Sequence, residues 1–368
     1  MPHVRIVIAP DKFAGTLTAV QAAEAIATGW ARRAPADELV QLPMADGGPG
    51  FLDALSAGLG GELVSVTVSG PLGETVPAAI LQVGETAYVE SAQACGLHLH
   101  PAEDRDPARA TSAGVGELVA AAAAKGAKRI VIGLGGSGTN DGGAGLLAAL
   151  GATSRPAGAL TGGPEALRSL ESVDLSAAHE AVRGIELLAA TDVDNPLLGL
   201  RGATNIFGAQ KGVSDEDKPR LDAALEHLAT LAGAGQEKAA GAGAAGGLGW
   251  ALLVLGAKRV PGIATVADAL GLPGQLARAD LLISGEGSFD AQSAGGKVVV
   301  GVARMAERAA RPCVVIAGQV QVGNREMRAM GIESAYSMVE IAGREASFGR
   351  PAQALADVAE RVARSWSR

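Results

Sequence analysis

The sequence predicts an α/β protein with two domains, in which both ends of the chain form one discontinuous domain and the middle forms an inserted domain. Apolar strands alternate with amphipathic helices at both ends, whereas short alternating segments of a different kind begin near residue 61. A chain of 368 residues is long enough for two domains of ordinary size. We therefore place one α/β domain at residues 1–60 plus 276–368 and an inserted, mixed-sheet α/β domain at residues 61–275.

The first elements follow a β-α-β pattern. Residues 4–9 form an apolar run that predicts a buried strand, residues 18–32 have the spacing of an amphipathic helix, and residues 39–42 predict a second strand. Thr16 and Thr18 both precede this helix, and either can cap its first turn.

The middle of the chain has a different texture. Antiparallel sheet is predicted by three alternating segments separated by glycine-containing turns, at residues 63–68, 78–83 and 86–90. A helix over about 108–125 then leads to a strand from residue 130, and a further strand is predicted at 185–190. Residues 232–249 are rich in Gly and Ala and form the most linker-like segment, although their last glycines lead into an apolar helix.

Strand-helix alternation returns in the last third of the chain. Strands are predicted at residues 281–284, 313–317 and 335–339, and helices at about 296–310 and 351–365. These units resemble the opening ones, so we expect both ends of the chain to share one sheet.

Composition limits the ligands. The net charge of −8 argues against binding nucleic acid or an anionic membrane through bulk charge, so small molecules are the expected partners. Cys95 and Cys313 are far apart and match no zinc pattern, which fits a reducing compartment. With no export signal or membrane-length apolar run, the sequence predicts a cytoplasmic protein, and a homodimer is compatible with it.

The predicted strand at residue 130 runs into a glycine-rich loop, residues 133–143, and a predicted helix follows this loop. Glycines let a backbone approach an anion closely, and the N–H groups at the start of the helix are expected to point toward it. Seven residues are therefore predicted to bind phosphate: Gly135, Gly136, Ser137, Thr139, Asn140, Gly142 and Gly143. Asp141, beside a bound polyphosphate, suggests Mg²⁺.

A dinucleotide site is the competing interpretation of this loop. Residues 133–138 and 241–246 both match G-x-G-x-x-G. The first match lacks the acidic residue expected about 20 positions later at a strand end, and the second follows no strand. Both matches are therefore attributed to the 52 glycines of the chain rather than to NAD binding.

Charged residues follow the first two strands. Asp11 and Lys12 come after the first, and Asp46, Gly47 and Gly48 come after the second. Ligands of open α/β sheets bind outside the carboxyl ends of the strands, so these residues are predicted to contact substrate or phosphate.

Asp192 follows the predicted strand at 185–190 and is the first candidate for the catalytic base. An ionised aspartate can accept a hydroxyl proton as the oxygen attacks phosphorus. Asn195 lies in the same segment and is a candidate substrate contact, but Asp, Asn and Pro also suit an ordinary turn, so that alternative stays open.

Two further segments carry charges between glycines. Lys211 is flanked by glycines in residues 208–212 and can face a phosphate as a point charge. Glu286 and Asp290 follow the strand at 281–284, and Lys297 begins the next helix. This is not a P-loop, because Val298 stands where Ser or Thr would bind Mg²⁺.

Seven blocks of the chain together resemble the bacterial type I glycerate kinase family, in order and spacing, over essentially its whole length. They are residues 8–13, 44–48, 69–73, 135–143, 207–212, 241–247 and 284–293. The resemblance implies phosphorylation of D-glycerate by ATP and Mg²⁺, most often to 2-phosphoglycerate, on a flavodoxin-like domain that carries an inserted second domain.

Four positions depart from the family pattern. This chain has Ala14, Pro49, Phe51 and Ala209 where the family usually has Lys, Glu, often Thr, and Pro. The altered Lys and Glu positions favour a rival hypothesis, a kinase or phosphatase for another small hydroxy acid. A nucleotide- or phosphate-sensing protein without activity is the other rival.

In the leading hypothesis the loop at 135–143 holds the ATP phosphates and Asp192 orients or deprotonates a glycerate hydroxyl. Lys12 and Lys211 would neutralise the substrate carboxylate and the transferred phosphate. Mg²⁺ would lie among Asp141, Glu286 and Asp290, and the active site would lie in a cleft between the two domains.

Overall fold

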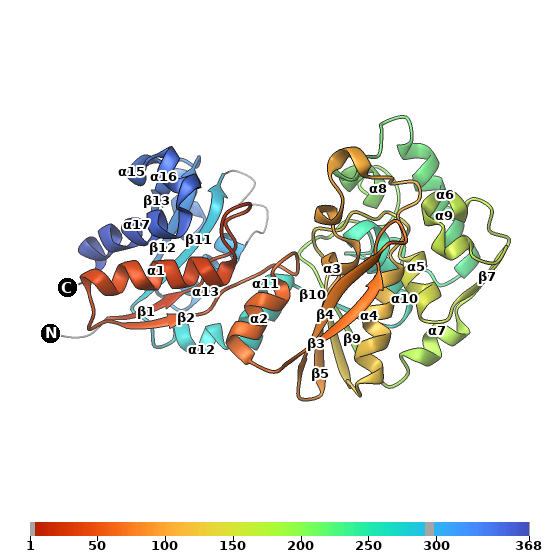
Figure 1. The fold of residues 1–368 in the computed structure, drawn as a ribbon, viewed down its shortest axis with the longest axis horizontal. Helices are drawn as coiled ribbons and strands as arrows, with labels where there is room; N and C mark the ends of the chain where they lie inside the picture. The colour runs from red at the N-terminus through yellow and green to blue at the C-terminus, as the bar shows by residue number, and fades with distance from the viewer. Residues whose placement is uncertain (1–3, 291–297, 368) are drawn as a thin grey trace. The chain divides into compact units, whose positions relative to one another are not determined.

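The computed structural model describes residues 4–290 and 298–367, and the chain divides into two compact units (Figure 1). Unit 1 comprises Met1–Asp46, Asp53–Gly60 and Ile263–Arg368, and unit 2 comprises Gly47–Leu52 and Gly61–Gly262. Among the described residues, none of the helices is both long and apolar enough to cross a membrane.

Unit 1 is built on a parallel sheet of five strands in the order β13-β12-β11-β1-β2. The strands are β1 (Arg5–Ile8), β2 (Glu38–Gln41), β11 (Leu281–Phe289), β12 (Cys313–Val320) and β13 (Ser334–Ser337). The sheet joins strands from both ends of the chain, and the predicted α/β class with a flavodoxin-like parallel sheet is confirmed.

The helices of unit 1 lie between these strands in the sequence, except for the last three, which follow β13. They are α1 (Ala19–Arg33), α11 (Gly262–Ala269), α12 (Leu272–Leu276), α13 (Val298–Arg308), α14 (Asn324–Ala329), α15 (Met338–Ala342), α16 (Arg344–Gly349) and α17 (Pro351–Trp366). Thr18 caps α1, because its hydroxyl accepts from the N–H of Gln21 while the Gln21 side chain accepts from the Thr18 N–H. The helix α2 (Phe51–Leu59) is divided between the two units.

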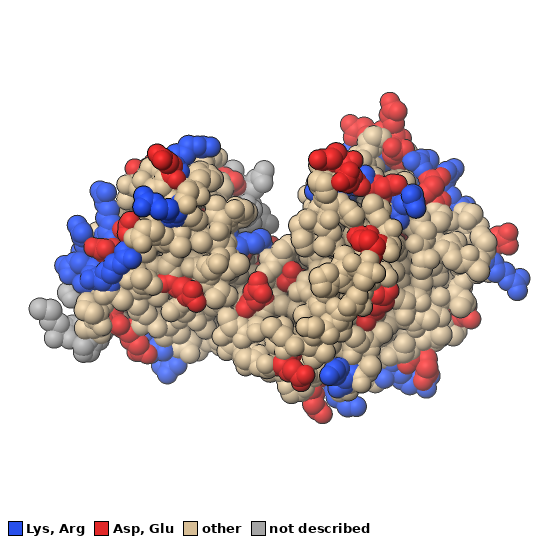
Figure 2. Space-filling model, viewed as in Figure 1, with Lys and Arg blue, Asp and Glu red and all other residues tan. Residues whose placement is uncertain are grey.

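The core of unit 1 explains its apolar strands. Ile6, Ile8 and Ile283 are fully buried in one cluster with residues of α1 and α17, while Val7 and Leu282 are equally buried on the alternate positions. A parallel sheet covered on both faces needs such continuous apolar strands. Figure 2 shows Lys and Arg side chains gathered over α1 and α17, where Arg32 pairs with Asp357 at 3.0 Å.

Unit 2 is built on a mixed sheet of six strands in the order β10-β9-β6-β5-β4-β3. The strands are β3 (Glu62–Ser69), β4 (Thr75–Val83), β5 (Thr86–Glu90), β6 (Arg129–Gly133), β9 (Glu186–Ala190) and β10 (Lys258–Val260). The pairs β3-β4 and β4-β5 are antiparallel and the other pairs are parallel, which confirms the prediction of a mixed sheet. A separate two-stranded ribbon joins β7 (Thr153–Arg155) to β8 (Ser172–Asp174).

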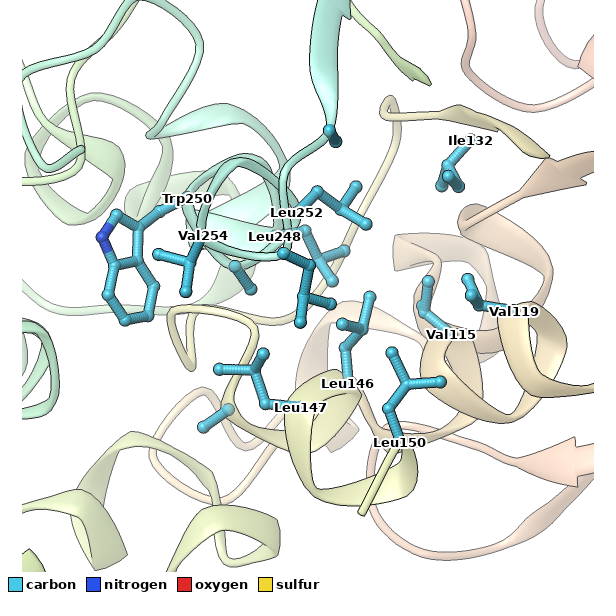
Figure 3. Packing of buried hydrophobic residues seen from close by; sticks show 14 of the residues in the cluster. Val115, Val119, Ile132, Leu146, Leu147, Leu150, Leu248, Trp250, Leu252 and Val254 are labelled. Carbon is cyan, nitrogen blue, oxygen red and sulfur yellow. The ribbon is translucent and has the colours of Figure 1, made fainter. Parts of the chain in front are cut away.

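Eight α-helices among the described residues belong to unit 2, and α2 contributes its first residues. The eight helices are α3 (Ala92–Cys95), α4 (Ala113–Ala124), α5 (Ala144–Ala149), α6 (Gly163–Leu167), α7 (Ser176–Ala181), α8 (Ala203–Phe207), α9 (Lys218–Ala232) and α10 (Leu248–Val254). Short 3₁₀ turns include η1 (Leu97–Leu99), η2 (Ala102–Asp104), η3 (Ala159–Thr161), η4 (Ala209–Lys211) and η5 (Ala244–Gly247). Figure 3 shows α4, α5 and α10 packing through Val115, Val119, Leu146, Leu248 and Leu252.

Two boundaries of the units differ from the expected ones. Unit 2 ends at Gly262 rather than at residue 275, because α11 packs in unit 1, where Ile263 lies against Gly301 of α13. Gly47–Leu52 is grouped with unit 2 because its backbone packs against the loop after β6.

Candidate active site

The glycine-rich loop after β6 is mostly buried. Thr139, Asn140 and Asp141 are completely buried, and Ser137 is 4% exposed. The amide of Asn140 donates to the hydroxyl of Thr204 at 2.9 Å. Gly135, Gly136 and Gly138 are the parts of the loop that reach the surface. An anion can therefore meet backbone N–H groups at the first half of the loop, whereas the second half faces the interior of unit 2.

The Asp141 carboxylate is buried and accepts hydrogen bonds from protein donors. Its Oδ2 accepts from both the N–H and the hydroxyl of Ser112 at 2.8 Å and from the N–H of Gly145 at 3.1 Å, and its Oδ1 accepts from the N–H of Gly143 at 3.1 Å. Burial raises the pKa of Asp141, and these donors act in the opposite direction. With both oxygens already hydrogen bonded, the carboxylate does not fit the predicted role of a Mg²⁺ ligand.

The N–H groups at the start of α5 likewise donate to acceptors within the protein. Gly143 and Gly145 donate to the Asp141 carboxylate, Ala144 donates to the Asp141 carbonyl, and Leu146 donates to the Ser112 hydroxyl at 3.1 Å. The expectation that these N–H groups point at a bound phosphate is therefore wrong. An aspartate takes the place that an anion would have at this helix end.

Lys211 supplies a positive charge beneath the loop. It is 1% exposed, and its Nζ donates to the Ser137 hydroxyl at 3.1 Å and to the Thr139 carbonyl at 2.6 Å. Burial lowers the pKa of Lys211 to about 8, while the nearby Cys95 and Asp141 act in the opposite direction. Burial of a lysine is unfavourable unless function or pairing retains it, so this charge marks a candidate site.

Arg105 helps to place Lys211. Its guanidinium donates to the carbonyls of Leu97 at 3.0 Å and His100 at 3.3 Å, and also to that of Gln210 at 3.1 Å. Arg105 is not predictable from the sequence, because its contacts are all to carbonyl groups and leave no motif.

The glycines of the loop serve close packing of backbones. A Cβ added to Gly135 would lie 2.6 Å from the Cα of Gly48, and one added to Gly133 would lie 2.5 Å from the carbonyl oxygen of Gly47. The segment after β2 therefore lies directly against the loop after β6. Gly47 and Gly48, predicted as phosphate contacts, are buried in this packing.

The second glycine run packs on the other half of the loop. A Cβ on Gly246 would lie 2.0 Å from the Thr139 carbonyl oxygen, and the N–H of Gly142 donates to the Gly246 carbonyl at 2.9 Å. Gly246 has φ +71°, which glycine adopts without strain. The segment interpreted as linker-like is thus a structural partner of the loop, and both apparent dinucleotide fingerprints are backbone packing motifs.

Glu90 is a second site residue that the sequence does not predict. It ends β5, is 5% exposed, and its Oε2 accepts from the N–H groups of Gly50 at 3.2 Å and Leu52 at 3.1 Å. Glu90 therefore fixes the segment that packs on Gly135. An acidic residue at the end of a predicted strand was the only sign of it in the sequence.

Asp192 emerges beside the loop. The strands β6 and β9 are adjacent and parallel, Gly133 is in register with Ala190, and the N–H of Leu134 donates to the Ala190 carbonyl at 2.9 Å. Asp192 follows two residues later and is partly exposed. The amide of Asn195, in contrast, donates to the carbonyl of Arg201 at 2.8 Å and so closes a turn.

Unit 1 has a pocket of its own, of about 460 Å³, at the carboxyl ends of its strands. The predicted residues Asp11, Lys12, Asp46 and Glu286 line it, and the Lys12 Nζ lies 3.9 Å from Asp11 Oδ1. Asp290 accepts from the Ser288 hydroxyl at 3.2 Å. Lys297 lies outside the described residues. Within either unit, the described residues form no group of three or more His, Cys, Asp or Glu placed to hold a metal ion.

A family model described as the glycerate kinase family matches residues 6–367. The chain belongs to the glycerate kinase family. It is 41% identical over 345 residues to a glycerate kinase of Bacillus subtilis (strain 168), covering 91% of this chain and 90% of that protein. It is also 41% identical over 349 residues to a glycerate 2-kinase of Escherichia coli (strain K12), covering 92% of each.

A solved structure from Salmonella typhimurium LT2, described as a glycerate kinase 2, superposes with a TM-score of 0.85 at 38% identity and covers 99% of this chain and 98% of that one. This member of the glycerate kinase family is therefore an enzyme, a kinase, and membership implies that it binds a substrate and a nucleotide. The rival hypothesis of a sensing protein without activity is set aside.

Proposed function

We propose that this enzyme transfers the terminal phosphoryl group of ATP to D-glycerate and forms 2-phosphoglycerate and ADP. The observation that carries the proposal is the arrangement at the carboxyl ends of β6 and β9 in unit 2. There the buried Lys211 lies under surface amides of the loop after β6, and Asp192 emerges from the adjacent strand. The Escherichia coli relative, named glycerate 2-kinase, supports the choice of hydroxyl.

Phosphoryl transfer needs positioning and charge stabilisation rather than covalent help from the protein. The backbone amides of Gly135 and Gly136 would hold phosphate oxygens, since these glycines reach the surface, whereas the N–H of Gly138 donates to the Cys95 carbonyl at 2.6 Å. Lys211 would stabilise the charge on the transferred group through the loop, not by direct contact, because Ser137 and Thr139 cover its Nζ. Lys12, half-buried in the unit 1 pocket, would neutralise a further anionic group.

Asp192 would act as the base. The C2 hydroxyl oxygen of glycerate attacks the γ-phosphorus, the bond from that phosphorus to the bridging oxygen of ADP breaks, and the hydroxyl proton passes to the Asp192 carboxylate. Asp192 is partly exposed at a strand end, whereas Asp141 is fully buried. Asn195 would support the turn that carries Asp192.

Mg²⁺ would be held by one or two carboxylates together with the nucleotide phosphates, as is usual for kinases. Asp141 does not fit this role, since protein donors occupy both of its oxygens. Glu286, with Asp11 or Asp46 beside it in the unit 1 pocket, fits better, and Asp290 is retained as a further candidate. When bound, Mg²⁺ would reduce the charge of the phosphates.

The test compares Asp192→Asn with Asp194→Asn in a coupled assay that measures ADP release with D-glycerate and Mg-ATP. Loss of a general base lowers kcat roughly 100-fold or more. Asp194 lies in the same turn but is 74% exposed and pairs with Arg259 at 2.5 Å, so its amide variant should keep kcat within about twofold of wild type. Near-normal turnover of Asp192→Asn would remove this residue from the mechanism.

The identity of the product shows which hydroxyl of glycerate is phosphorylated. Phosphorus NMR after turnover should show 2-phosphoglycerate, and exclusive 3-phosphoglycerate would refute the choice of hydroxyl. A panel of small hydroxy acids in the same assay checks the acceptor, because Ala14 and Pro49 stand where the family pattern has Lys and Glu. A better acceptor than D-glycerate would support the rival kinase hypothesis.

A further inference from the structure

The unit 1 pocket has two chemically different sides. The order of the strands places Asp11, Asp46 and Glu286 on the side of β11, β1 and β2. Met338 and Val339 follow β13 at the opposite edge of the sheet, and α16 contributes Phe348 to the same side. One side is therefore acidic and the other apolar, with Gly318 and Gln319 of β12 between them.

In the middle of the pocket, the outer edge of β12 has no neighbouring strand among the described residues. The last residue of β12 that pairs with β13 is Ala317, in register with Ser337, whereas β12 continues to Val320 along β11. At Gly318 and Gln319 the outer edge of β12 therefore faces the pocket instead of a strand of this sheet. A strand edge presents N–H and C=O groups in alternation, and these can pair with the donor and acceptor edge of a flat heterocycle.

The apolar side includes an unusual surface residue. Phe348, one of the five phenylalanines of the chain, is 53% exposed. The Arg344 guanidinium lies 5.1 Å from its ring centroid. An exposed aromatic ring at the rim of a pocket gains buried apolar surface when a flat ligand covers it. Aromatic rims of this kind stack on bases or other flat ring systems.

Size and charge disfavour the three-carbon acid as the occupant. A cavity of about 460 Å³ lies in the range of roughly 300–1,000 Å³ that accommodates drug-sized ligands. Three carboxylates and one lysine line its acidic side, so a small anion would meet more repulsion than attraction there. A neutral, flat and partly apolar group matches the other side.

We infer that the unit 1 pocket binds the nucleoside of the ATP co-substrate, with the purine between Val339 and Phe348 and its edge on β12 at Gly318 and Gln319. The inference rests on the proposed function, since it concerns the nucleotide of that reaction. It assigns the base to unit 1 and makes Val339 and Phe348 determinants of nucleotide affinity. The carboxylates on the other side then lie where a cation-bound phosphate chain begins.

The experiment measures ADP binding to the full-length enzyme by titration calorimetry in the presence of Mg²⁺. Phe348→Ala removes an exposed ring and leaves the core intact, and Val339→Trp fills the apolar side. Each should weaken ADP binding about fivefold or more, as expected for loss of base stacking. Ile206→Trp, at a 49% exposed position of unit 2, is the matched control and should leave ADP binding within twofold of wild type.

Inorganic tripolyphosphate is the control ligand. It lacks a base, so its affinity should change less than twofold in both pocket variants. An equal loss for ADP and tripolyphosphate, or no loss for ADP, overturns the inference. A rise in KM for glycerate with unchanged ADP affinity overturns it as well, since the pocket would then bind the acid.

The outcomes separate this inference from the proposed function. Wild-type enzyme that fails to phosphorylate D-glycerate, but loses ADP binding in both pocket variants, refutes the proposed acceptor and leaves the nucleoside site standing. Wild-type enzyme that forms 2-phosphoglycerate, but binds ADP equally well in all variants, refutes only the nucleoside site.

Discussion

Replacement of Lys211 by methionine should change how the stability of the enzyme depends on pH. Methionine keeps an unbranched side chain of similar length and removes the buried charge. Burial lowers the pKa of Lys211 from its ordinary value of 10.5 to about 8. At about 1.4 kcal/mol for each pKa unit, the whole shift corresponds to roughly 3 kcal/mol.

The sign follows from where the proton is bound. Below pH 8 the lysine is protonated in both the folded and the unfolded chain, so the folded state bears the full penalty of the buried charge. Between pH 8 and 10.5 only the unfolded chain retains the proton, and the free energy of unfolding rises with pH. From pH 7 to about pH 9.5, wild type should gain about 2 kcal/mol relative to Lys211→Met.

Urea unfolding of both proteins at the two pH values measures this gain as a change in their difference. Other titrating groups are shared by the two proteins and largely cancel. The lost hydrogen bonds to Ser137 and Thr139 set a constant offset and do not change with pH. Lys125→Met, at an exposed position after α4, is the control and should show no such change. A wild-type to Lys211→Met difference that stays constant within about 0.5 kcal/mol would refute the reasoning.

Three further predictions concern the residues that hold the loop. Gly246→Ala should destabilise the enzyme by about 2 kcal/mol more than Gly184→Ala in urea unfolding, because both glycines have positive φ but only Gly246 would place a Cβ against the Thr139 carbonyl. Ser112→Ala should cost about 1–3 kcal/mol in the same measurement, since Asp141 loses a donor and the N–H of Leu146 loses its acceptor. Ser176→Ala, at an exposed helix start, should cost less than about 1 kcal/mol. Glu90→Gln should speed hydrogen exchange at Gly50 and Leu52 about tenfold while exchange within α1 stays unchanged, and unaltered exchange at both amides would contradict its role.

Much of the fold follows from local patterns. Residues 63–68 and 78–83 alternate in polarity, and they pair as the antiparallel strands β3 and β4. The continuous apolar runs at 4–9 and 281–284 become the adjacent parallel strands β1 and β11. Periodicity predicts such elements because it records how many faces of a strand are buried.

The candidate site was predictable only in part. Sequence spacing placed Asp192 and the glycine-rich loop after apolar strands, and the structure brings those strand ends together as neighbours. Sequence spacing did not show that both oxygens of Asp141 accept hydrogen bonds from the protein, because its main partner, Ser112, lies 29 residues earlier in the chain. Hydrogen bonds between side chains distant in sequence leave no periodic pattern.

The sequence by itself determined the α/β class, the family and the strand ends at which chemistry is expected, since these depend on residue type and local spacing. Only the tertiary structure decided the role of each glycine and carboxylate. Gly135 and Gly246 are glycines because another backbone lies against them, and Lys211 is buried because the loop after β6 closes over it. Each of these roles depends on which distant atoms lie within a few ångströms, and folding alone sets those distances.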